Sequence, residues 1–328
     1  MKSHFDFYQY IFSKPQGVAW HPENGFSPLE KSVNSEYALT LISPALSFDN
    51  VHAVLSALHK HCRILSVSLH PLSGLLSCYG LVVAVDITDT EAHIKELAAK
   101  LAQQFSMEIA LTHLAPSLSE PGLLVMDMDS TMIQMECIDE IARLAGRYDD
   151  VAAVTEQAMQ GKLDFAQSLK TRVACLEGVE ESALLQIKSA LPLMPGLVTL
   201  LTELKKRQWV LAIASGGFTY FADHLKAWLE LDDAVSNVLA LENGKLTGKT
   251  KGRVIDAQVK AETVVALQQK YNIAPHQTVA IGDGANDVLM MRQASLGVAF
   301  HAKPTVRTQA DAAVNHLPLD ALLLLLKP

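Results

Sequence analysis

Apolar and polar residues alternate differently in the two halves of the chain. In the first half, short strand-like runs enclose two segments whose apolar residues recur at helical spacing. The expected order is strand, helix, strand, strand, helix, strand, over residues 37–43, 48–62, 64–69, 75–87, 90–107 and 108–113. This β-α-β-β-α-β order is typical of a ferredoxin-like α+β domain. Residues 1–35 show no clear period and carry three prolines, so we expect an irregular N-terminal arm.

The two halves are separated by a segment of different composition. Residues 114–122 read Leu-Ala-Pro-Ser-Leu-Ser-Glu-Pro-Gly, a composition that disfavours both helix and strand. The sequence therefore predicts a first domain at 1–113, a linker at 114–122 and a second domain at 123–328.

The second domain opens on a continuous apolar run, residues 123–126, which suits a strand buried on both faces. Residues 133–191 then read as four helices, too many for a single crossover, so we expect a helical cap inserted after the first strand. Helices and strands alternate beyond it. The expected helices are 197–207, 219–229, 257–271 and 285–294, and the expected strands are 209–214, 234–241, 278–282 and 296–300. This pattern predicts an α/β fold with a parallel sheet.

Two carboxylates follow the first strand of this sheet. Asp127 comes directly after the apolar run and Asp129 two residues later. Ligands of open α/β sheets bind beyond the carboxyl ends of the strands. A turn rich in solvated aspartates would explain this stretch if it stood alone.

Three more polar features occur at comparable places. The strand at 209–214 ends in Ser215-Gly216-Gly217, whose backbone could approach an anion. The strand at 278–282 leads into Gly282-Asp283-Gly284-Ala285-Asn286-Asp287, and Lys260 lies on the preceding helix. Singly, these would read as a plain turn, an aspartate N-cap and a solvated lysine. Their joint occurrence in this order favours a functional site.

Composition narrows the alternatives. A chain of 328 residues with 49% hydrophobic residues can fill two cores. Its formal net charge of -8 argues against a general nucleic-acid binder. The four cysteines have no metal-ligand spacing, and we expect a reducing cytoplasm. Neither a signal peptide nor a run of about 20 apolar residues is evident, so we expect no membrane partner.

The motifs together resemble those of haloacid dehalogenase-superfamily phosphatases, and more closely those of bacterial phosphoserine phosphatases. The resemblance rests on Asp127-Met128-Asp129-Ser130-Thr131, Ser215-Gly216-Gly217, Lys260 and the Gly282–Asp287 segment, and it covers 123–328. It implies a Rossmann-like core with a helical cap at about 133–191. The first domain resembles the ACT-like regulatory domain of longer members.

The resemblance also implies catalytic roles. Asp127 would attack phosphorus and form an aspartyl-phosphate, and Asp129 would act as general acid and base. The crowded carboxylates require a cation, and oxygen ligands point to one Mg²⁺ per site. Its expected ligands are Asp127, the Asp129 main-chain carbonyl and Asp283, with Asp287 supporting them from behind. The groups expected on the phosphoryl oxygens are Ser215, the Gly216 N–H, Lys260 and Asn286.

Residues of the cap would select the substrate. Glu136 would pair with an ammonium and Arg172 with a carboxylate. Met159 and Phe165 match positions that line the pocket in phosphoserine phosphatases. In an unrelated cap, Glu136 would be a first-turn helix residue and Arg172 a surface cation. The resemblance therefore implies O-phospho-L-serine as substrate, in the last step of L-serine biosynthesis.

Other functions remain open from the sequence alone. One is a phosphatase or phosphotransferase for another phospho-amino acid, such as phosphothreonine or phosphohomoserine. A second is a phosphoacceptor signalling module, which the cap and Asp129 argue against. A third is an amino-acid-binding regulator with a vestigial phosphatase half. For the first domain we expect a role in regulation or association, with homodimer formation through its sheet edges and helix faces.

Overall fold

The computed structural model describes the chain except residues 1–3, 15, 30–32 and 34. The chain divides into two compact units. The first comprises Met1–Ser119 together with Asp311–Pro328, and the second is Glu120–Ala310.

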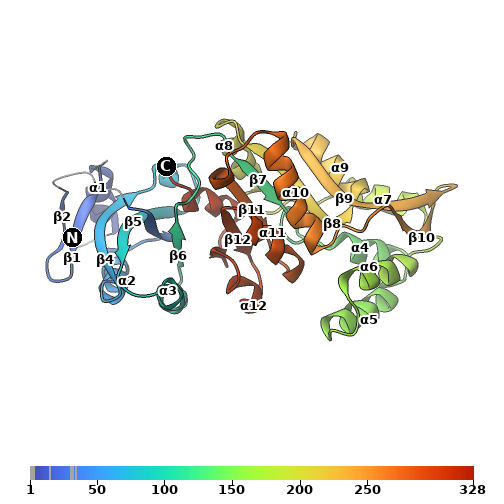
Figure 1. Ribbon diagram of the computed structural model, residues 1–328, viewed down its shortest axis with the longest axis horizontal. Coiled ribbons are helices and arrows are strands. Elements are labelled where there is room, and N and C mark those ends of the chain that lie inside the picture. The colour runs from blue at the N-terminus through green and yellow to red at the C-terminus, as the bar shows by residue number, and fades with distance from the viewer. Residues whose placement is uncertain (1–3, 15, 30–32, 34) are drawn as a thin grey trace. The chain divides into compact units, whose positions relative to one another are not determined.

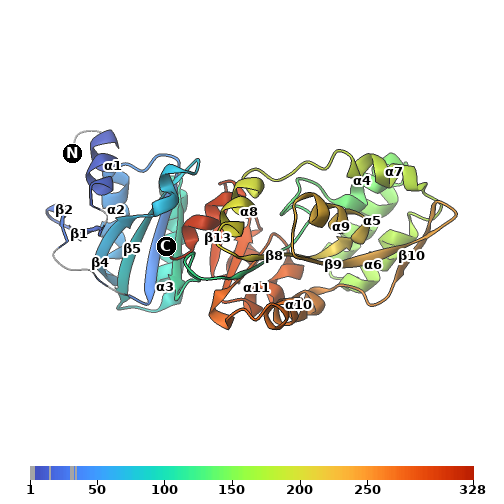
Figure 2. The same ribbon diagram turned by 90° about the horizontal axis from the view of Figure 1, so that it is seen from above.

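The first unit is built on a six-stranded sheet, seen from two sides in Figures 1 and 2. Its order is β2-β1-β4-β5-β3-β6. The strands are β1 (Val18–His21), β2 (Gly25–Pro28), β3 (Tyr37–Ser43), β4 (Cys62–Leu69), β5 (Tyr79–Ile87) and β6 (Glu108–His113). With helices α2 (Phe48–Leu58) and α3 (Glu91–Phe105), strands β3 to β6 have the predicted ferredoxin-like order. Both helices begin at hydroxyl N-caps, Ser47 and Thr90.

The expectation of an irregular arm at residues 1–35 is wrong. The segment contains helix α1 (His4–Phe12) and the antiparallel hairpin β1–β2. Phe7 and Ile11 are buried, and the Phe7 ring lies 5.4 Å from that of Phe26 and 6.0 Å from that of Phe48. These elements are too short to show a period in sequence, and they form because the rest of the unit covers their apolar side chains.

The last eighteen residues, Asp311–Pro328, belong to the first unit, whereas we expected them in the phosphatase domain. They contain strand β13 (Ala312–Val314) and a buried 3₁₀ segment, Leu319–Leu325. Glu108, at the start of β6, accepts hydrogen bonds from this segment. Its donors are Asn315 N at 2.7 Å, Asn315 Nδ2 at 2.6 Å and His316 N at 2.8 Å. These contacts join residues about two hundred positions apart, which local pattern cannot predict.

The second unit is the predicted α/β core with a helical cap. Its strands follow the order β10-β9-β8-β7-β11-β12, parallel except for the antiparallel pair β9–β10. They are β7 (Leu123–Met126), β8 (Val210–Phe218), β9 (Asp233–Glu242), β10 (Lys245–Lys251), β11 (Thr278–Gly282) and β12 (Leu296–Phe300). Strand β7 lies between β8 and β11, so the three motif-bearing strands are neighbours.

The helices of this unit also agree closely with expectation. The cap holds α4 (Cys137–Leu144), α5 (Tyr148–Met159), α6 (Phe165–Ala174) and α7 (Glu181–Lys188) (Figure 1). The core holds α8 (Leu197–Lys205), α9 (Thr219–Trp228), α10 (Ala257–Lys270), α11 (Val288–Gln293) and α12 (Pro304–Arg307). The helix expected at 285–294 begins as a 3₁₀ turn, Ala285–Asp287, which gives way to α11 at Val288.

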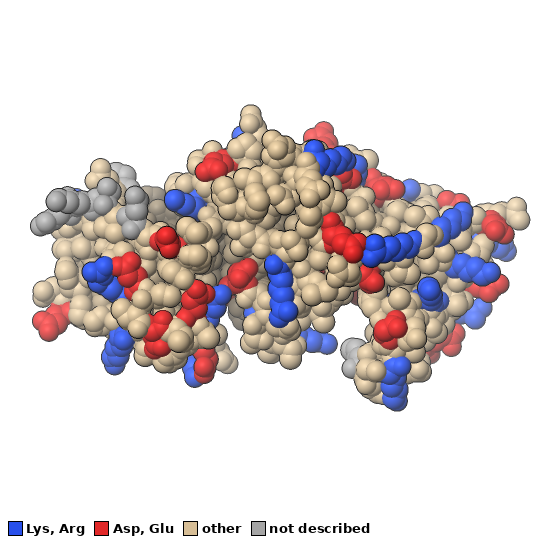
Figure 3. Space-filling model, in the orientation of Figure 1, with Lys and Arg blue, Asp and Glu red and all other residues tan. Residues whose placement is uncertain are grey.

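Charged side chains of both signs are interspersed on the face seen in Figure 3. Within the described part of the chain, no helix combines the length and apolar character needed to cross a bilayer.

Candidate active site

Three adjacent strands bring the acidic motifs to one edge of the sheet. Met126 of β7 pairs in register with Ile281 of β11 and Ile213 of β8. The backbone N–H of Asp127 donates to the carbonyl of Ile281 at 3.0 Å, which extends the pairing by one residue. The two acidic strand ends therefore lie side by side, as their common position after buried strands implied.

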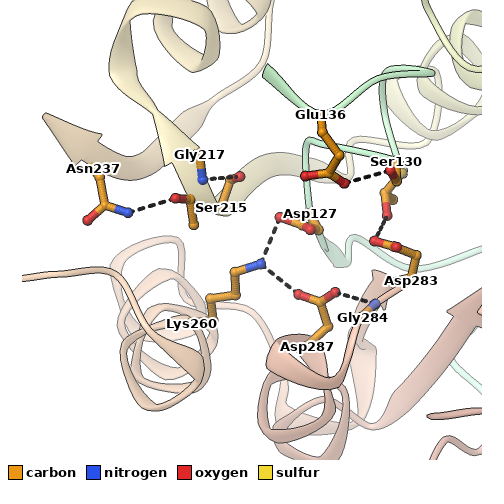
Figure 4. A network of polar contacts seen from close by, with 12 residues as sticks. Asp127, Ser130, Glu136, Ser215, Gly217, Asn237, Lys260, Asp283, Gly284 and Asp287 are labelled. Atoms are coloured by element: carbon orange, nitrogen blue, oxygen red, sulfur yellow. Dashed lines mark hydrogen bonds and ion pairs between the residues drawn. The ribbon is translucent and has the colours of Figure 1, made fainter. Parts of the chain in front are cut away.

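Three carboxylates meet at this edge. Carboxylate oxygens of Asp127, Asp283 and Asp287 all lie within 4.8 Å of one another. Figure 4 shows them converging from β7 and from the turn after β11. Asp287 is held on its far side by the Gly284 N–H at 2.9 Å, and Thr131 Oγ1 donates to Asp283 at 3.4 Å.

Lys260 of α10 joins two of these carboxylates. Its Nζ donates to Asp127 Oδ1 at 2.7 Å and to Asp287 Oδ1 at 2.6 Å, and its side chain is 0% exposed. Burial opposes the ammonium form, but Asp127 and Asp287 outweigh it and raise the pKa of Lys260. The lysine is therefore a permanent buried cation and not the solvated side chain that a lone helical lysine usually is.

The remaining negative charge calls for another cation. Burial, with Asp127 and Asp287 next in importance, raises the pKa of Asp283 to about 8. Burial and Asp127 raise the pKa of Asp287 to about 6, although Lys260 acts against them. One lysine thus leaves the cluster under-neutralised. A set of carboxylate oxygens at this spacing suits a hard divalent cation, so the residues fit the metal expected at this position.

Close backbone approach shapes the turns around the cluster. A Cβ on Gly282 would lie 2.4 Å from Cγ of Asp287, so only glycine lets that carboxylate pack against the strand. A Cβ on Gly217 would lie 2.6 Å from the Met128 side chain and 3.0 Å from Asp129 Oδ2. Glycine at these positions brings the two loops together.

The segment 215–217, near the end of β8, is held by a residue that sequence reasoning missed. Ser215 Oγ accepts from Gly217 N at 2.9 Å. Asn237 of β9, which is 2% exposed, donates from Nδ2 to the Gly216 carbonyl at 2.8 Å and accepts from the Ile255 N–H at 2.9 Å. A buried asparagine inside a strand is unfavourable unless it makes such bonds. The polar Asn237 within an otherwise largely apolar strand was therefore the feature of the sequence that could have indicated this role.

A cavity of about 170 Å³ opens beside the carboxylates. Its lining combines residues of the core and the cap. They are Asp127, Asp129, Glu136, Ile138, Phe165, Leu169, Arg172, Ser215, Gly216, Gly217, Phe218, Asp283 and Asn286.

Asp129 and Glu136 form an acidic wall of this cavity. Burial raises the pKa of Asp129 well above its ordinary value, and the negative charge of Glu136 is the next largest cause. Glu136 accepts a hydrogen bond from Ser130 Oγ at 2.7 Å and keeps contact with solvent. Partial removal from solvent nevertheless raises the pKa of Glu136, although the hydrogen bond from Ser130 acts against it. These effects shift Asp129 toward its protonated form, in which a carboxyl group can donate a proton.

Arg172 reaches the same cavity from α6. Its Nε is buried and has no hydrogen-bond partner among the described residues. Burial lowers the pKa of Arg172, and Asp139, Glu136 and Asp129 act in the opposite direction. A buried guanidinium with an unused donor is poised to receive an anionic group.

The structure brings most of the predicted site residues together. Those lining the cavity are Asp127, Asp129, Glu136, Phe165, Arg172, Ser215, Gly216, Asp283 and Asn286. Lys260 and Asp287 lie behind Asp127 and do not line it. The side chain of Met159, the last residue of α5, lies outside the described residues. Gly217, part of the predicted Ser215-Gly216-Gly217 motif, also lines the cavity, and the lining residues that sequence reasoning missed are Ile138, Leu169 and Phe218, which read as ordinary helix or strand core.

Comparisons with known proteins agree with this geometry. The chain is 57% identical over 227 residues to a phosphoserine phosphatase of Haemophilus influenzae, covering 69% of this chain and 72% of that protein. A probable phosphoserine phosphatase from Vibrio cholerae, solved unliganded, superposes with a TM-score of 0.73 at 41% identity over 88% of this chain and 86% of that one. A substrate-bound phosphoserine phosphatase complex superposes with a TM-score of 0.60 at 37% identity over 63% and 99%.

Residues 122–295 match the family of haloacid dehalogenase-like hydrolases. This range contains β7, the cap, the Ser215 loop, Lys260 and the turn after β11, so the match covers every residue that lines the cavity. On its sequence, its fold and the arrangement of its acidic cluster, the chain belongs to the haloacid dehalogenase-like hydrolases.

Proposed function

We propose that the protein is a phosphoserine phosphatase, which hydrolyses O-phospho-L-serine to L-serine and phosphate through an aspartyl-phosphate. One observation carries the proposal: a single cavity is lined by Asp127 and Asp129 and also by Glu136 and by Arg172, whose buried Nε has no hydrogen-bond partner among the described residues. A phospho-amino acid presents one group for each part of this lining. Its phosphate meets the strand ends, its ammonium Glu136 and its carboxylate Arg172.

The first half of the reaction transfers the phosphoryl group to Asp127. An oxygen of its carboxylate attacks phosphorus as the bond to the serine oxygen breaks. Asp129, whose pKa is raised by burial, gives a proton to the departing oxygen. Lys260 holds Asp127 in place through the hydrogen bond from Nζ to Oδ1. Serine leaves as the neutral alcohol.

The second half releases phosphate. Asp129, now a carboxylate, takes a proton from the water that attacks phosphorus, and the bond to Asp127 breaks. Ser215 and the backbone N–H of Gly216 lie in the same lining and would donate to the phosphoryl oxygens in both steps. Asn237 holds the Gly216 carbonyl and so fixes the backbone that follows this N–H.

The proposal includes Mg²⁺ as the cation of the acidic cluster. Asp127, Asp283 and the main-chain carbonyl of Asp129 would hold it, with Asp287 supporting from the Lys260 side. When bound, the ion supplies charge neutralisation for the phosphate oxygens.

The experiment that tests the proposal measures phosphate release from a panel of substrates. O-phospho-L-serine, O-phospho-L-threonine, O-phosphohomoserine and O-phosphoethanolamine should be assayed at matched concentrations with Mg²⁺. We expect the highest kcat/KM for O-phospho-L-serine. A preference for O-phosphoethanolamine would contradict a role for Arg172, and a preference for phosphothreonine or phosphohomoserine would move the assignment to another phospho-amino acid. Long-lived phosphoprotein without turnover would instead indicate a phosphoacceptor module.

The first unit would serve regulation or association in this proposal. Its ferredoxin-like sheet corresponds to the ACT-like domain expected from sequence, and it would provide the surface of a homodimer. The proposed location is the cytoplasm, in keeping with free thiols at Cys62, Cys78, Cys137 and Cys175.

A further inference from the structure

Two histidines and an aspartate meet on the first unit, far along the chain from the catalytic motifs. Asp89 Oδ2 lies 2.9 Å from His61 Nδ1 and 2.7 Å from His93 Nδ1. The two imidazole rings have centroids 4.6 Å apart and are inclined at 66°. One carboxylate oxygen is therefore shared by two nitrogen atoms that are both common metal ligands.

The backbone fixes this arrangement. Thr88 N donates to the His61 carbonyl at 3.1 Å, which ties the α2–β4 turn to the start of α3. Thr90 caps α3 by accepting from His93 N at 3.3 Å, so Asp89 and His93 stand one helical turn apart. The trio is thus held by links that do not involve its own side chains.

The second oxygen of Asp89 is also held. Asp89 Oδ1 accepts from the backbone N–H of Thr90 at 2.7 Å, which leaves Oδ2 directed at the two rings. Metal-binding side chains typically have such an outer partner, because it sets the orientation of the ligand atom. The two histidine side chains are 28% and 50% exposed and that of Asp89 is 32% exposed, so an ion can reach the trio from solvent.

We propose that His61, Asp89 and His93 form a binding site for a divalent transition-metal ion on the first unit. Two imidazole nitrogens and one carboxylate oxygen suit Zn²⁺ and similar ions better than Mg²⁺, which prefers oxygen ligands. Their donor atoms lie within 4.8 Å of one another, and Zn²⁺ binds such atoms at about 2.0–2.2 Å. Water completes the fourth position of a tetrahedral site.

Charge and proton balance favour this occupant. An ionised carboxylate only accepts hydrogen bonds, so each Nδ1 that approaches Asp89 carries a hydrogen. A neutral ring with this hydrogen has none on Nε2, so the ion can bind at Nδ1 when the hydrogen passes through solvent to Nε2, and the ring then neither gains nor loses a proton. Bound Zn²⁺ would clamp the turn before β4 to the first turn of α3, joining two parts of the first unit that are 28 residues apart.

The test measures Zn²⁺ binding to the full-length chain by isothermal titration calorimetry, after chelator treatment and with excess Mg²⁺ present. The double variant His61→Asn/His93→Asn should bind one ion fewer than the unaltered protein. The matched control is His113→Asn, because His113 lies 3.6 Å from Glu36 on the same unit but has no second histidine on that carboxylate. The His113→Asn control should bind as many Zn²⁺ ions as the unaltered protein. When Co²⁺ is added instead, the visible spectra of the control and of the unaltered protein should both show a site with nitrogen ligands.

The difference between the number of Zn²⁺ ions bound by the unaltered protein and by the double variant counts only this site, because any Zn²⁺ that enters the catalytic cluster binds to both proteins. Phosphatase activity with Mg²⁺ should be the same in all these proteins, which also shows that they are folded. Should the double variant fail to fold, Asp89→Asn retains an oxygen for Thr90 and should weaken Zn²⁺ binding at least tenfold, at the lower end of the effect of altering metal-site residues. Equal stoichiometry and affinity in the unaltered and variant proteins would overturn the proposal and leave an ordinary hydrogen-bonded cluster.

Discussion

Lys260 donates a hydrogen bond from Nζ to Oδ1 of Asp127 at 2.7 Å, and their side chains are 0% and 7% exposed. The same ammonium also binds Asp287. This buried cation stabilises the carboxylates from the side away from the cavity. The opposite side of the Asp127 carboxylate is thereby left for phosphate and metal.

Replacing Lys260 with methionine should therefore destabilise the metal-free protein strongly. Asp127 and Asp287 would stay buried without their cation, and breaking a buried ion pair typically costs about 3–5 kcal/mol. Urea unfolding in the presence of a chelator measures the loss. Lys270→Met is the matched control on the same helix, because Lys270 is 58% exposed in its pair with Asp233 and should lose at most about 1 kcal/mol. Similar losses in both variants would contradict the buried role of Lys260.

Replacing Asp127 with asparagine should abolish turnover with little effect on the fold, because the amide lacks the attacking oxygen but keeps the shape of the side chain. Asp129→Asn should instead leave a slow enzyme that accumulates phosphoprotein, since water then lacks its base. Rapid acid quenching with labelled substrate distinguishes the two. Retention by Asp127→Asn of a tenth of kcat, a barrier change of only about 1.4 kcal/mol, would show that Asp127 is not the nucleophile.

Replacing Arg172 with alanine should lower kcat/KM for O-phospho-L-serine by about 10- to 150-fold, the equivalent of one charge-assisted hydrogen bond. O-phosphoethanolamine lacks the carboxylate, so its kcat/KM should change little. Arg143→Ala is the control in the same cap, because Arg143 is 53% exposed and pairs with Glu140 at the surface. An equal loss for both substrates would assign Arg172 to phosphate binding or folding.

How far sequence predicts such a site depends on the range of the interactions involved. Asp127 and Asp283 were found because each follows a buried strand of a parallel sheet, and Ser215 because it lies near the end of another; parallel strands end at one edge. Lys260 was assigned to the phosphoryl group through family resemblance. That it also crosses to Asp287 follows from the packing of α10 against the sheet, which sequence pattern does not contain.

The same distinction explains the errors in the fold. Most strands and helices of both units were predicted because periodicity is a local property, whereas β10 and α12 were not among the expected elements. Helix α1, the hairpin β1–β2 and the grouping of residues 311–328 with the first unit depend on contacts with distant residues. The role of Asn237 also depends on contacts with distant residues, because its partners Gly216 and Ile255 come from two other segments.

Metal binding should release protons near neutral pH. The raised pKa of Asp283, about 8, means that the metal-free folded protein keeps a proton which an unfolded chain loses near pH 3.8. Between these values, rising pH ionises the unfolded chain first, so this group lowers the stability of the metal-free protein as pH increases. Mg²⁺ requires the carboxylate, so its affinity should rise with pH up to about 8.

Calorimetric titration of Mg²⁺ at pH 7 in buffers of different ionisation enthalpy measures the protons released. Asp283→Asn removes the titrating group and should abolish both the release and most of the binding. Binding of unchanged affinity between pH 6 and 8 with no proton release would show that Asp283 is already ionised in the metal-free protein.

Replacing Glu108 with alanine should destabilise the first unit but spare catalysis. Glu108 is 2% exposed and accepts three hydrogen bonds from Asn315 and His316, so its loss leaves buried donors unpaired. Each unpaired buried donor costs about 1–3 kcal/mol, and the variant should lose at least about 2 kcal/mol. Every cavity-lining residue lies within Glu120–Ala310, so kcat at 25 °C should be unchanged.

Differential scanning calorimetry and limited proteolysis test this division of the chain. The unfolding of the first unit should shift to lower temperature, and cleavage should appear first within residues 1–119 or 311–328. Glu96→Ala serves as the control, because Glu96 is 65% exposed in a helical pair with Lys100 and should change stability by about 0.5 kcal/mol or less. A Glu108→Ala protein that is folded but inactive would show that the packing of the C-terminal segment sets the geometry of the active site, and the two units could then not be treated as independent.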